Sequence, residues 1–587
     1  MNQQNRKKLA LLIATVLSGT AVMASCGGNN GEEKPDPTKT TYIYLQNYDC
    51  GYGREYLIET AKKFEEAVKD ISYEEGKTGV HIEMLHTQTN STGKGLLTNL
   101  PSSQYEVFFT NEIHPTLLKT NGFIMDISDI MNATSADNIG RFAGETSIYD
   151  RMYPDWQDYY LEEDGSMYGF PLFMQTYNFT YDAELLETKK MYIRKDSTDA
   201  KLNFTSDKAQ FSTGPDGKTG VIDGVDYSLD DGLPATYDQF YLWCDALANS
   251  AGVIPIHYSG IYQQHIDFAL QQLWAEFEGK DNVKACWTFD GTEMSDFINV
   301  DDSGNVTYLP KTAITTENGY MVQKQEGRYR AMQFAEKLAD NRAKWINPYA
   351  FSGSESHTEA QGTYISSKYT TTPILMLAEG GYWEAEATES FTKLENRNGG
   401  KHDRKFALLP TPKYSREQVG ERSTLLTMTG GSVVVKKSVE TAANKQAIID
   451  FLLFFNSEEM MEFQNTHCPL ARPFDYELSK ETRNSMTTYQ KSMYDRTHHA
   501  NVDVVFAGDR NDFTFANFDQ LDFYYYIFYS RYNKDSDLTS YLSVTTFKDY
   551  PSVTAEQYFN GFYNYLTHKN TANSISVWEA MLNKIQG

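Results

Sequence analysis

Thr41-Tyr-Ile-Tyr-Leu-Gln46 is the first stretch that predicts a β-strand, because its residues are mostly β-branched or aromatic. Asn47-Tyr-Asp-Cys-Gly-Tyr-Gly53 follows and indicates a turn. Residues 55–68 then place apolar side chains at helical spacing. A strand, a turn and a helix in this order predict an α/β fold, and the same order recurs further along the chain.

The pattern continues to about residue 455. Further strands are expected at 80–85, 106–110, 169–173, 253–258 and 431–436. Further helices are expected at 115–119, 237–248, 266–278, 328–338 and 442–455. Strands that alternate with helices of this length favour parallel sheets with crossover helices.

Residues 194–232 interrupt this alternation. The turn signals Gly214-Pro-Asp-Gly217 and Asp223-Gly224 predict an inserted β-hairpin region. Asp223, Asp226, Asp230 and Asp231 could suggest calcium, but their spacing does not match an EF-hand loop. We therefore expect solvated turn carboxylates there.

Composition excludes several classes of protein. The chain has 587 residues, enough for about two to four domains, and 40% of them are hydrophobic. A net charge of −26 makes nucleic-acid binding an unlikely main function. Five cysteines exclude a disulfide-rich scaffold. Four of them, Cys50, Cys244, Cys286 and Cys468, form no zinc pattern, and buried thiols or one disulfide both remain open.

The N-terminus carries a targeting signal. Arg6, Lys7 and Lys8 precede a short apolar run, and residues 1–25 are therefore expected to be a signal peptide. Met23-Ala24-Ser25-Cys26 resembles the bacterial lipobox, which implies that Cys26 carries lipid on the extracytoplasmic face of the cell membrane. The alternative is a plain signal peptide followed by a chance cysteine. Residues 26–40 are expected to be a flexible tether.

Common catalytic motifs are absent from the sequence. It contains no GxSxG elbow, HExxH helix, Walker A loop or GxGxxG fingerprint. Glu384 and Glu386, beside Trp383, are the best available pair for a glycosidase, although nothing singles them out. His498-His499 is expected at the surface. We therefore expect no enzyme, no catalytic residue, no metal and no cofactor.

Seven short motifs appear in an order typical of one family. They are Asn47-Tyr-Asp with Gly51, Phe108-Phe-Thr-Asn-Glu112 before Asn121-Gly-Phe-Ile-Met-Asp-Ile-Ser128, Met167-Tyr-Gly-Phe-Pro171 before Gln175, Leu233-Pro-Ala-Thr-Tyr237, Met376-Leu-Ala-Glu-Gly-Gly-Tyr-Trp383, Phe406-Ala-Leu-Leu-Pro-Thr-Pro412, and Gly430-Gly-Ser-Val-Val-Val435 before Pro469-Leu-Ala-Arg-Pro473. Together, over residues 41–473, they resemble the family 1 extracellular solute-binding proteins of ABC importers, which include maltose-binding-like sugar receptors. Asp182 stands where that family usually has Asn, and residues 480–587 match only loosely.

The resemblance implies an α/β, two-lobed periplasmic-binding-protein fold (class II-like), with a hinge and an interlobe ligand cleft. Lobe one would comprise residues 41–165 plus 420–480, and lobe two residues 166–419 plus 481–587. The family's ligand-binding positions correspond here to Asn47, Asp49, Asn111, Glu112, Gln175, Tyr262, Gln263, Tyr382, Trp383, Gly430, Gly431 and Arg472.

Several of these residues also have a purely structural interpretation. Trp383 could fill the core of the second lobe, and Asp49 could cap the first helix. Gln175 could hydrogen-bond the backbone at the hinge, Arg472 could pair with an acidic surface, and Glu112 could simply be exposed. Both interpretations stay open at the level of the sequence.

The function implied by the resemblance is that of a receptor. It would bind a carbohydrate, most simply an oligosaccharide, and deliver it to an ABC transporter permease as a monomer held to the membrane only by its lipid. One alternative is a secreted, lipid-anchored glycoside hydrolase. Another is a surface glycan-binding lipoprotein that serves an outer-membrane system. The role of the Tyr- and Phe-rich C-terminal segment stays open.

Overall fold

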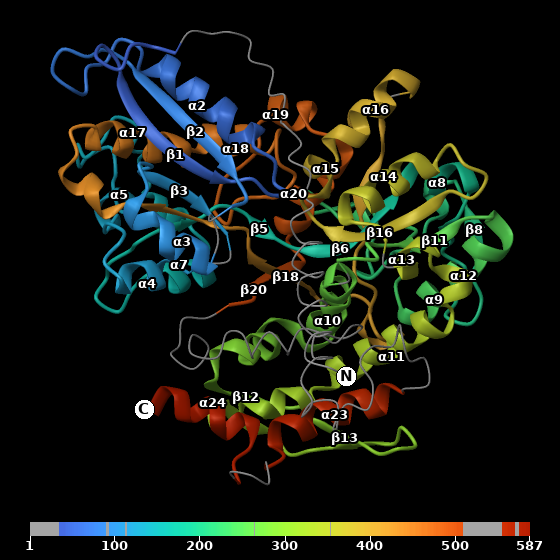
Figure 1. Ribbon diagram of the computed structural model, residues 1–587. Coiled ribbons are helices and arrows are strands. Elements are labelled where there is room, and N and C mark those ends of the chain that lie inside the picture. The colour runs from blue at the N-terminus through green and yellow to red at the C-terminus, as the bar shows by residue number, and fades with distance from the viewer. Residues whose placement is uncertain are drawn as a thin grey trace, which may run out of the picture.

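The computed structural model describes residues 34–89, 93–111, 114–262, 264–352, 354–398, 400–508, 554–569 and 574–586. Two larger β-sheets organise these residues, and a short third sheet lies between them (Figure 1). The signal peptide, Cys26, Glu112, Gln263 and residues 509–553 lie outside the described residues.

The first sheet has five strands in the order β2-β1-β3-β19-β4. Their bounds are β1 Thr41–Tyr48, β2 Val80–Thr87, β3 Val107–Thr110, β19 Ser432–Val435 and β4 Phe170–Pro171. β1 runs parallel to β2 and β3, whereas β19 runs antiparallel to β3 and β4. The expected parallel sheet is therefore mixed, because β19 and β4 arrive from distant parts of the chain.

Apolar patterning explains how this sheet is covered. Ile43 and Leu45 on β1 are fully buried, and α2 turns Leu57, Ala61 and Phe64 inward at helical spacing. The helices of this lobe have these bounds: α2 Glu55–Ala67, α3 Gly93–Asn99, α4 Pro115–Thr120, α5 Ser128–Met131, α6 Ile148–Arg151, α7 Pro154–Tyr160, α17 Lys445–Phe455 and α18 Glu458–Gln464.

The second sheet has the order β11-β16-β6-β17 and is also mixed. Its strands are β11 Ile254–His257, β16 Ile374–Gly380, β6 Tyr177–Asp182 and β17 Phe406–Leu408. Its helices are α8 Ala183–Lys189, α9 Tyr237–Ala246, α10 Gln264–Thr288, α12 Arg342–Trp345, α13 Tyr349–Ser352, α14 His357–Ser367, α15 Trp383–Glu386, α16 Thr388–Asn398, α19 Lys480–Ser485 and α20 Thr488–Thr497. All seven residues of β16 are buried, as expected for a central strand.

A three-stranded sheet joins the two lobes. Its order is β20-β18-β5, with β5 Met174–Gln175, β18 Ser423–Thr429 and β20 Val502–Phe506. β5 lies between β4 of the first sheet and β6 of the second, and β18 lies between β17 and β19. The chain therefore passes between the lobes through both of these strands, which is the arrangement of a hinge.

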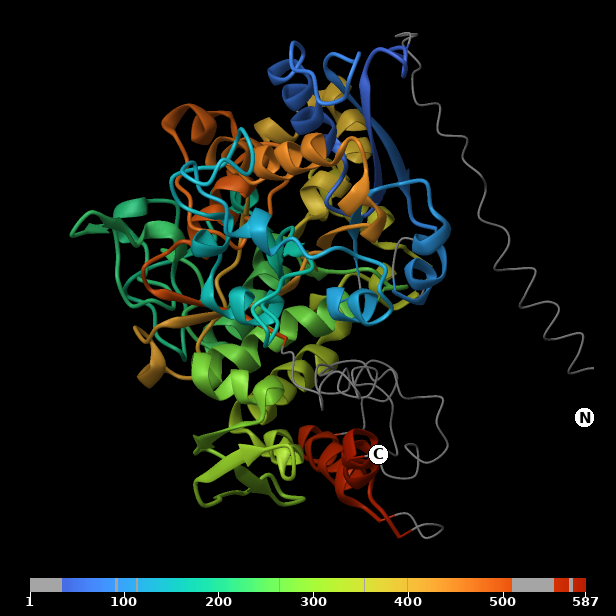
Figure 2. The same cartoon turned by 90° about the vertical axis from the view of Figure 1, so that its left-hand side faces the viewer.

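The third part of the molecule lies below the two lobes (Figure 1). It contains β12 Asp290–Met294, β13 Ile298–Val300, β14 Val306–Tyr308, β15 Thr312–Thr315, α11 Glu326–Asp340, α23 Ala555–Thr567 and α24 Val577–Gln586. Figure 2 shows the C-terminal helices beside these hairpins, at the end of the molecule away from the first sheet. Phe559 and Phe562 on α23 share a buried core with α11.

Several expectations about segment limits need correction. Phe170 and Pro171 pair with β19, so the first sheet extends past the expected lobe boundary at residue 165. Residues 34–40 are not a free tether: Lys34 Nζ lies 2.6 Å from Glu83 Oε1, and the Tyr42 hydroxyl donates to the Pro35 carbonyl at 2.5 Å. The insertion forms two short hairpins, β7 Tyr192–Ile193 with β8 Phe204–Thr205 and β9 Val221–Ile222 with β10 Val225–Asp226. No helix in the described part of the chain is long and apolar enough to cross a membrane.

Candidate functional site

The turn that follows β1 contacts the second lobe directly. A Cβ atom built on Gly51 would lie 2.3 Å from Tyr382 Cδ2 and 3.1 Å from Glu386 Oε1. Only glycine leaves room for this approach of the backbone to a ring. The turn therefore places lobe one against the end of β16 and the start of α15.

A chain of hydrogen bonds links this turn to the hinge. The Tyr52 hydroxyl donates to Gln175 Oε1 at 2.6 Å, and Gln175 Nε2 donates to the Tyr177 hydroxyl at 2.5 Å. Tyr52 also packs edge-on against Tyr382, with ring centroids 5.7 Å apart. Gln175 thus bonds side chains from both lobes, where the sequence left open a bond to the backbone.

Carboxylates and histidines of the second lobe pair beside these tyrosines. Glu379, at the end of β16, contacts His265 Nδ1 in the first turn of α10. Glu386 Oε1 lies 3.1 Å from His357 Nε2, and Gln361 Nε2 donates to Glu386 Oε2 at 2.6 Å. These groups come from α10, α14, β16 and α15, so four elements converge on one place.

A third pair extends the same edge of the second sheet. His257 ends β11, which runs beside β16, and its Nε2 lies 3.2 Å from Glu355 Oε2. The Ser259 hydroxyl and the Ile261 amide both donate to the Glu355 carbonyl, which holds the loop before Tyr262 in place. Three carboxylates thus lie at the carboxyl ends of neighbouring strands, where α/β sheets place their ligands.

Tyr262 forms the exposed rim of this place. It is 40% exposed, stacks on His265 at 6.2 Å with an interplanar angle of 18°, and packs edge-on against His357 at 4.8 Å. An exposed aromatic face beside buried polar groups is typical of small-molecule binding sites.

Together these residues form one interface between the lobes, which we call the interlobe cluster. Its members are Tyr52, Gln175, Tyr177, Tyr262, His265, His357, Gln361, Glu379, Tyr382 and Glu386. Burial raises the pKa of both Tyr177 and Tyr382, and the nearby carboxylates of Glu379 and Glu386 raise both pKa values further. The two hydroxyls therefore stay protonated and can donate or accept hydrogen bonds.

Some buried polar atoms of this region lack hydrogen-bond partners among the described residues. They are His257 Nδ1, His357 Nδ1, Gln361 Oε1 and Glu379 Oε2. An unsatisfied buried polar atom costs about 1–3 kcal/mol, so such atoms are normally bonded to water or to a ligand. Their concentration near Tyr262 makes this interface the candidate site of the described residues.

Three of the predicted site residues meet at the interlobe cluster: Gln175, Tyr262 and Tyr382. Asp49 lies at its lobe-one edge, where its carboxylate is 3.8 Å from Arg54 and Gln88 Nε2 donates to its carbonyl. The N-cap of α2 is Arg54, so Asp49 does not cap that helix. Asn111 is half-buried at the end of β3.

Other predicted site residues have structural roles. A Cβ on Gly430 would lie 2.7 Å from the Phe173 carbonyl oxygen, and one on Gly431 would lie 2.4 Å from that of Thr110. Gly431 also has a φ of +102°, which disfavours any other residue. Gly430 therefore permits close approach to the backbone before β5, and Gly431 permits close approach to the end of β3. Asn47 is buried, and its Nδ2 lies 3.1 Å from His86 Nδ1.

The expectation that Trp383 faces the cleft is wrong for this structure. Trp383 is fully buried among Tyr364, Phe406 and Tyr489, and its indole N–H donates to Thr180 Oγ1 at 3.1 Å. The glycine pair lets Tyr382, not Trp383, reach lobe one. Trp383 therefore fills a core.

Arg472 is also fully buried and does not pair with an acidic surface. Its guanidinium donates to Gln464 Oε1, Asn456 Oδ1 and the Pro171 carbonyl, at 2.9, 2.7 and 3.1 Å. Burial lowers its pKa to about 9. Arg472 therefore ties the returning loop to the lobe-one end of the hinge.

Sequence reasoning missed Tyr52, Tyr177, His265, His357 and Glu379. Glu379 lies at the carboxyl end of β16, a position that indicates a ligand edge, but the order of strands within a sheet could not be predicted from one sequence. Tyr177 begins the antiparallel neighbour β6 and so lies at the same edge. Of the proposed glycosidase pair, Glu386 belongs to the interlobe cluster. Glu384 instead accepts a hydrogen bond from Thr487 at 2.7 Å and is buried away from it.

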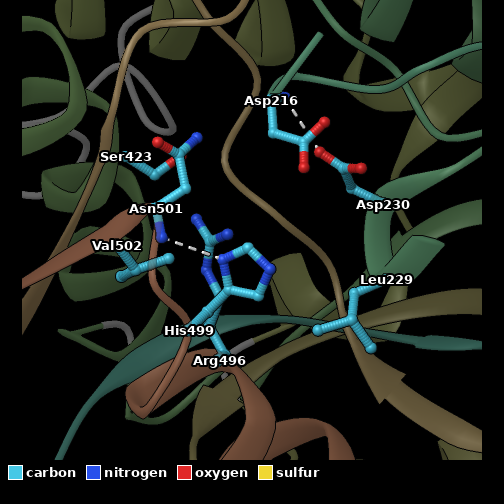
Figure 3. A pocket seen from close by; sticks show the side chains of 8 residues that line it. All are labelled: Asp216, Leu229, Asp230, Ser423, Arg496, His499, Asn501 and Val502. Atoms are coloured by element: carbon cyan, nitrogen blue, oxygen red, sulfur yellow. Dashed lines mark hydrogen bonds between the residues drawn. The ribbon is translucent and has the colours of Figure 1, made fainter. Parts of the chain in front are cut away.

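A small cavity lies elsewhere, between the insertion and β18, α20 and β20 (Figure 3). Asp216, Asp230, Arg496, His499 and Asn501 are among its lining residues, and its volume of about 10 Å³ admits one water molecule. Asp230 is only 3% exposed, so the expectation of a solvated turn carboxylate is wrong there. His499 lies in this wall, and its Nε2 is 3.0 Å from the Asp226 carbonyl. No group of three or more metal-binding side chains suited to an ion occurs in the described part of the chain.

Two comparisons of structure establish the fold. A chitin oligosaccharide binding protein matches 93% of this chain and 100% of its own, with 13% identity and a TM-score of 0.50. A structure described under xylan utilization by the thermophilic bacterium Caldanaerobius polysaccharolyticus matches 89% of this chain and 99% of its own, with 11% identity and a TM-score of 0.50. No protein-family model and no curated protein sequence matches the chain.

These findings and the hinge geometry define the class of fold. The chain has the two-lobed α/β fold of solute-binding proteins, as the sequence resemblance predicted. Its candidate site lies where that fold brings its two lobes together.

Proposed function

We propose that this protein is an extracytoplasmic receptor that binds a carbohydrate, most simply an oligosaccharide, between its lobes and delivers it to an ABC transporter permease. The interlobe cluster carries the proposal, because it combines exposed and buried aromatic rings with carboxylate, amide and imidazole groups at the hinge. Rings contribute contact area to a sugar face, and the planar polar groups direct hydrogen bonds to its hydroxyls.

Binding requires the lobes to move apart. In this structure Gly51 lies against Tyr382, and Tyr52 is bonded to Gln175 across the same gap. Opening at β5 and β18 would expose these groups to a ligand, and closure would return them around it. The unpartnered atoms of Gln361 and Glu379 would then meet ligand hydroxyls.

The remaining elements of the proposal follow from the sequence and the fold. Cys26 anchors the receptor by lipid to the outer face of the cell membrane, and the receptor acts as a monomer without cofactor. The similar structures include a binding protein and support a function without catalysis. A lipid-anchored glycoside hydrolase would need one carboxylic acid and one carboxylate on either side of the scissile bond. Here Glu379 and Glu386 are each paired with a histidine.

A thermal-shift screen tests the proposal. Purified protein without residues 1–25 is heated with neutral, acidic and amino oligosaccharides, because a ligand that binds only the folded state raises the melting temperature. We expect at least one oligosaccharide to raise it and isothermal titration to give saturable binding. Incubation of the same sugar with the protein should leave it uncleaved. Cleavage would favour the hydrolase, and a flat screen would contradict carbohydrate binding.

A further inference from the structure

The interlobe cluster, together with the adjacent His257–Glu355 pair, holds more carboxylates than permanently charged cations. The carboxylates of Glu355, Glu379 and Glu386 each lie within ion-pair distance of a histidine only: no lysine or arginine among the described residues pairs with them. Arg54, three residues after Gly51, pairs with Asp49. The site region therefore contains four carboxylates, three histidines that pair with three of them, and one permanently charged cation.

Burial strengthens the effect of these charges. Glu379 is 1% exposed, and the side chains of Glu355 and Glu386 are 12% and 16% exposed. Charges held away from water interact more strongly with a ligand than surface charges do. The chain as a whole has a net charge of −26, so its long-range electrostatic field is negative, like the charge of these carboxylates.

The unpartnered atoms point to the same kind of ligand. Two of the four unpartnered atoms, Glu379 Oε2 and Gln361 Oε1, are acceptors, so the ligand atoms that satisfy them must be donors. The other two, His257 Nδ1 and His357 Nδ1, can donate or accept. Hydroxyl and ammonium groups donate, whereas a carboxylate or sulfate only accepts and would bring like charge to the site. A protonated amine would meet a charged acceptor and form the stronger kind of hydrogen bond.

We propose that the interlobe cluster restricts the ligand to carbohydrates without acidic groups and favours those with a free, protonated amino group over their N-acetylated counterparts. This inference rests on the proposed function, because it assigns a ligand class to the same site. It concerns the charge of the sugar, not its length or linkage.

The test compares oligosaccharides that are matched in length. Titration at pH 6 first compares the affinity of the glucosamine tetramer with that of its N-acetylated counterpart. It then compares four neutral tetramers, malto-, cello-, xylo- and galactotetraose, with the acidic tetragalacturonate. We expect binding by one or more neutral or amino tetramers, affinity about tenfold higher for the glucosamine tetramer than for its acetylated form, and no binding of tetragalacturonate.

Variants separate this charge effect from shape. Glu386→Gln keeps the size of the side chain and should reduce the preference for the amine about tenfold. Glu379→Gln should act in the same direction, and circular dichroism checks that this buried variant folds. Glu384→Gln is the matched control, because Glu384 lies two residues from Glu386 but is bonded to Thr487 outside the cluster.

The outcomes are distinct. Binding of tetragalacturonate as strong as that of galactotetraose overturns the inference but leaves carbohydrate binding intact. An equal affinity for the two glucosamine-based tetramers, unchanged in Glu386→Gln, also overturns it. Failure of every tetramer to bind contradicts the proposed function, and the inference falls with it.

Discussion

The Tyr52 hydroxyl donates a 2.6 Å hydrogen bond to Gln175 Oε1, and so joins the first turn of one lobe to a strand of the hinge. Tyr52 lies in the turn that follows β1, whereas Gln175 lies in β5, 123 residues further along the chain. The bond is partly buried and continues through Gln175 to Tyr177 of the second lobe. It therefore links lobe one to the second lobe through the hinge.

Removal of this hydroxyl should weaken ligand binding. Tyr52→Phe keeps the ring packing but deletes the donor to Gln175, and a buried hydrogen bond contributes about 1 kcal/mol. We expect a five- to tenfold loss of carbohydrate affinity by isothermal titration, on the order of 1 kcal/mol. Tyr42→Phe is the control, because the Tyr42 hydroxyl also bonds a single oxygen but lies near the amino end of β1, away from the turn that holds Tyr52. Equal losses in both variants would contradict a role for this bond in lobe closure.

Gly51 should be sensitive to a single added methyl group. Gly51→Ala would place a Cβ atom 2.3 Å from the Tyr382 ring and push the lobes or the ring apart. We expect lower affinity and a lower melting temperature. In a Tyr382→Ala background the same change should lower affinity and melting temperature much less, because the obstructing ring is gone. A double-mutant cycle measures this coupling. Strictly additive effects would mean that the two residues do not meet in solution.

Trp383 should contribute to stability and not directly to binding. Trp383→Ala removes a fully buried ring from a packed core and should lower the free energy of unfolding by about 3–5 kcal/mol. Denaturant titration measures this loss, and Tyr308→Ala, which truncates an aromatic residue that is 62% exposed, should cost far less. A stable Trp383→Ala protein with strongly reduced affinity would restore the cleft position predicted from the sequence.

Glu384 should make stability depend on pH. Burial raises its pKa to about 7 from the ordinary value of 4.5, although the Thr487 hydrogen bond and Lys401 counteract part of this shift. The folded state then binds its proton more tightly than the unfolded state does. The contribution of Glu384 to stability is therefore fully present below about pH 4.5 and is lost as the pH rises through about 7.

Replacement of this carboxyl tests the pH dependence. Glu384→Gln keeps an acceptor for Thr487 and should raise the melting temperature at pH 8 relative to the unsubstituted protein, with a smaller difference at pH 4.5. Glu66→Gln, at an exposed position, should leave the difference in melting temperature between pH 8 and pH 4.5 as it is in the unsubstituted protein. A Glu384→Gln protein that loses the same stability at both pH values would contradict this account.

Lipid anchoring depends on Cys26 in our proposal. Cys26→Ala should move the protein from the membrane fraction to the soluble fraction of the cells that export it, because the thiol that would be acylated is gone. Cys50→Ala is the control, since Cys50 lies in the folded domain and is a free thiol. Membrane association of the Cys26→Ala protein would argue against the lipobox.

Much of the local structure could be predicted from the sequence, because it depends on short-range patterns. The strand predicted at 41–46 is β1, the helix predicted at 55–68 is α2, and the apolar run at 442–455 contains α17. Each is encoded by apolar spacing that matches its own period. The seven ordered motifs also pointed to the two-lobed fold, which the structure confirms.

Tertiary structure alone decided which side chains face one another. Trp383 and Tyr382 are adjacent in sequence and follow the same glycine pair, yet one fills the core and the other reaches the opposite lobe. Likewise Glu384 and Glu386 diverge within one short helix. The sequence by itself determined the elements and their order, since those depend on spacing along the chain. The direction of each side chain depends on packing against residues more than a hundred positions away, such as Thr180, Thr487 and Gly51, and only the assembled lobes settle it.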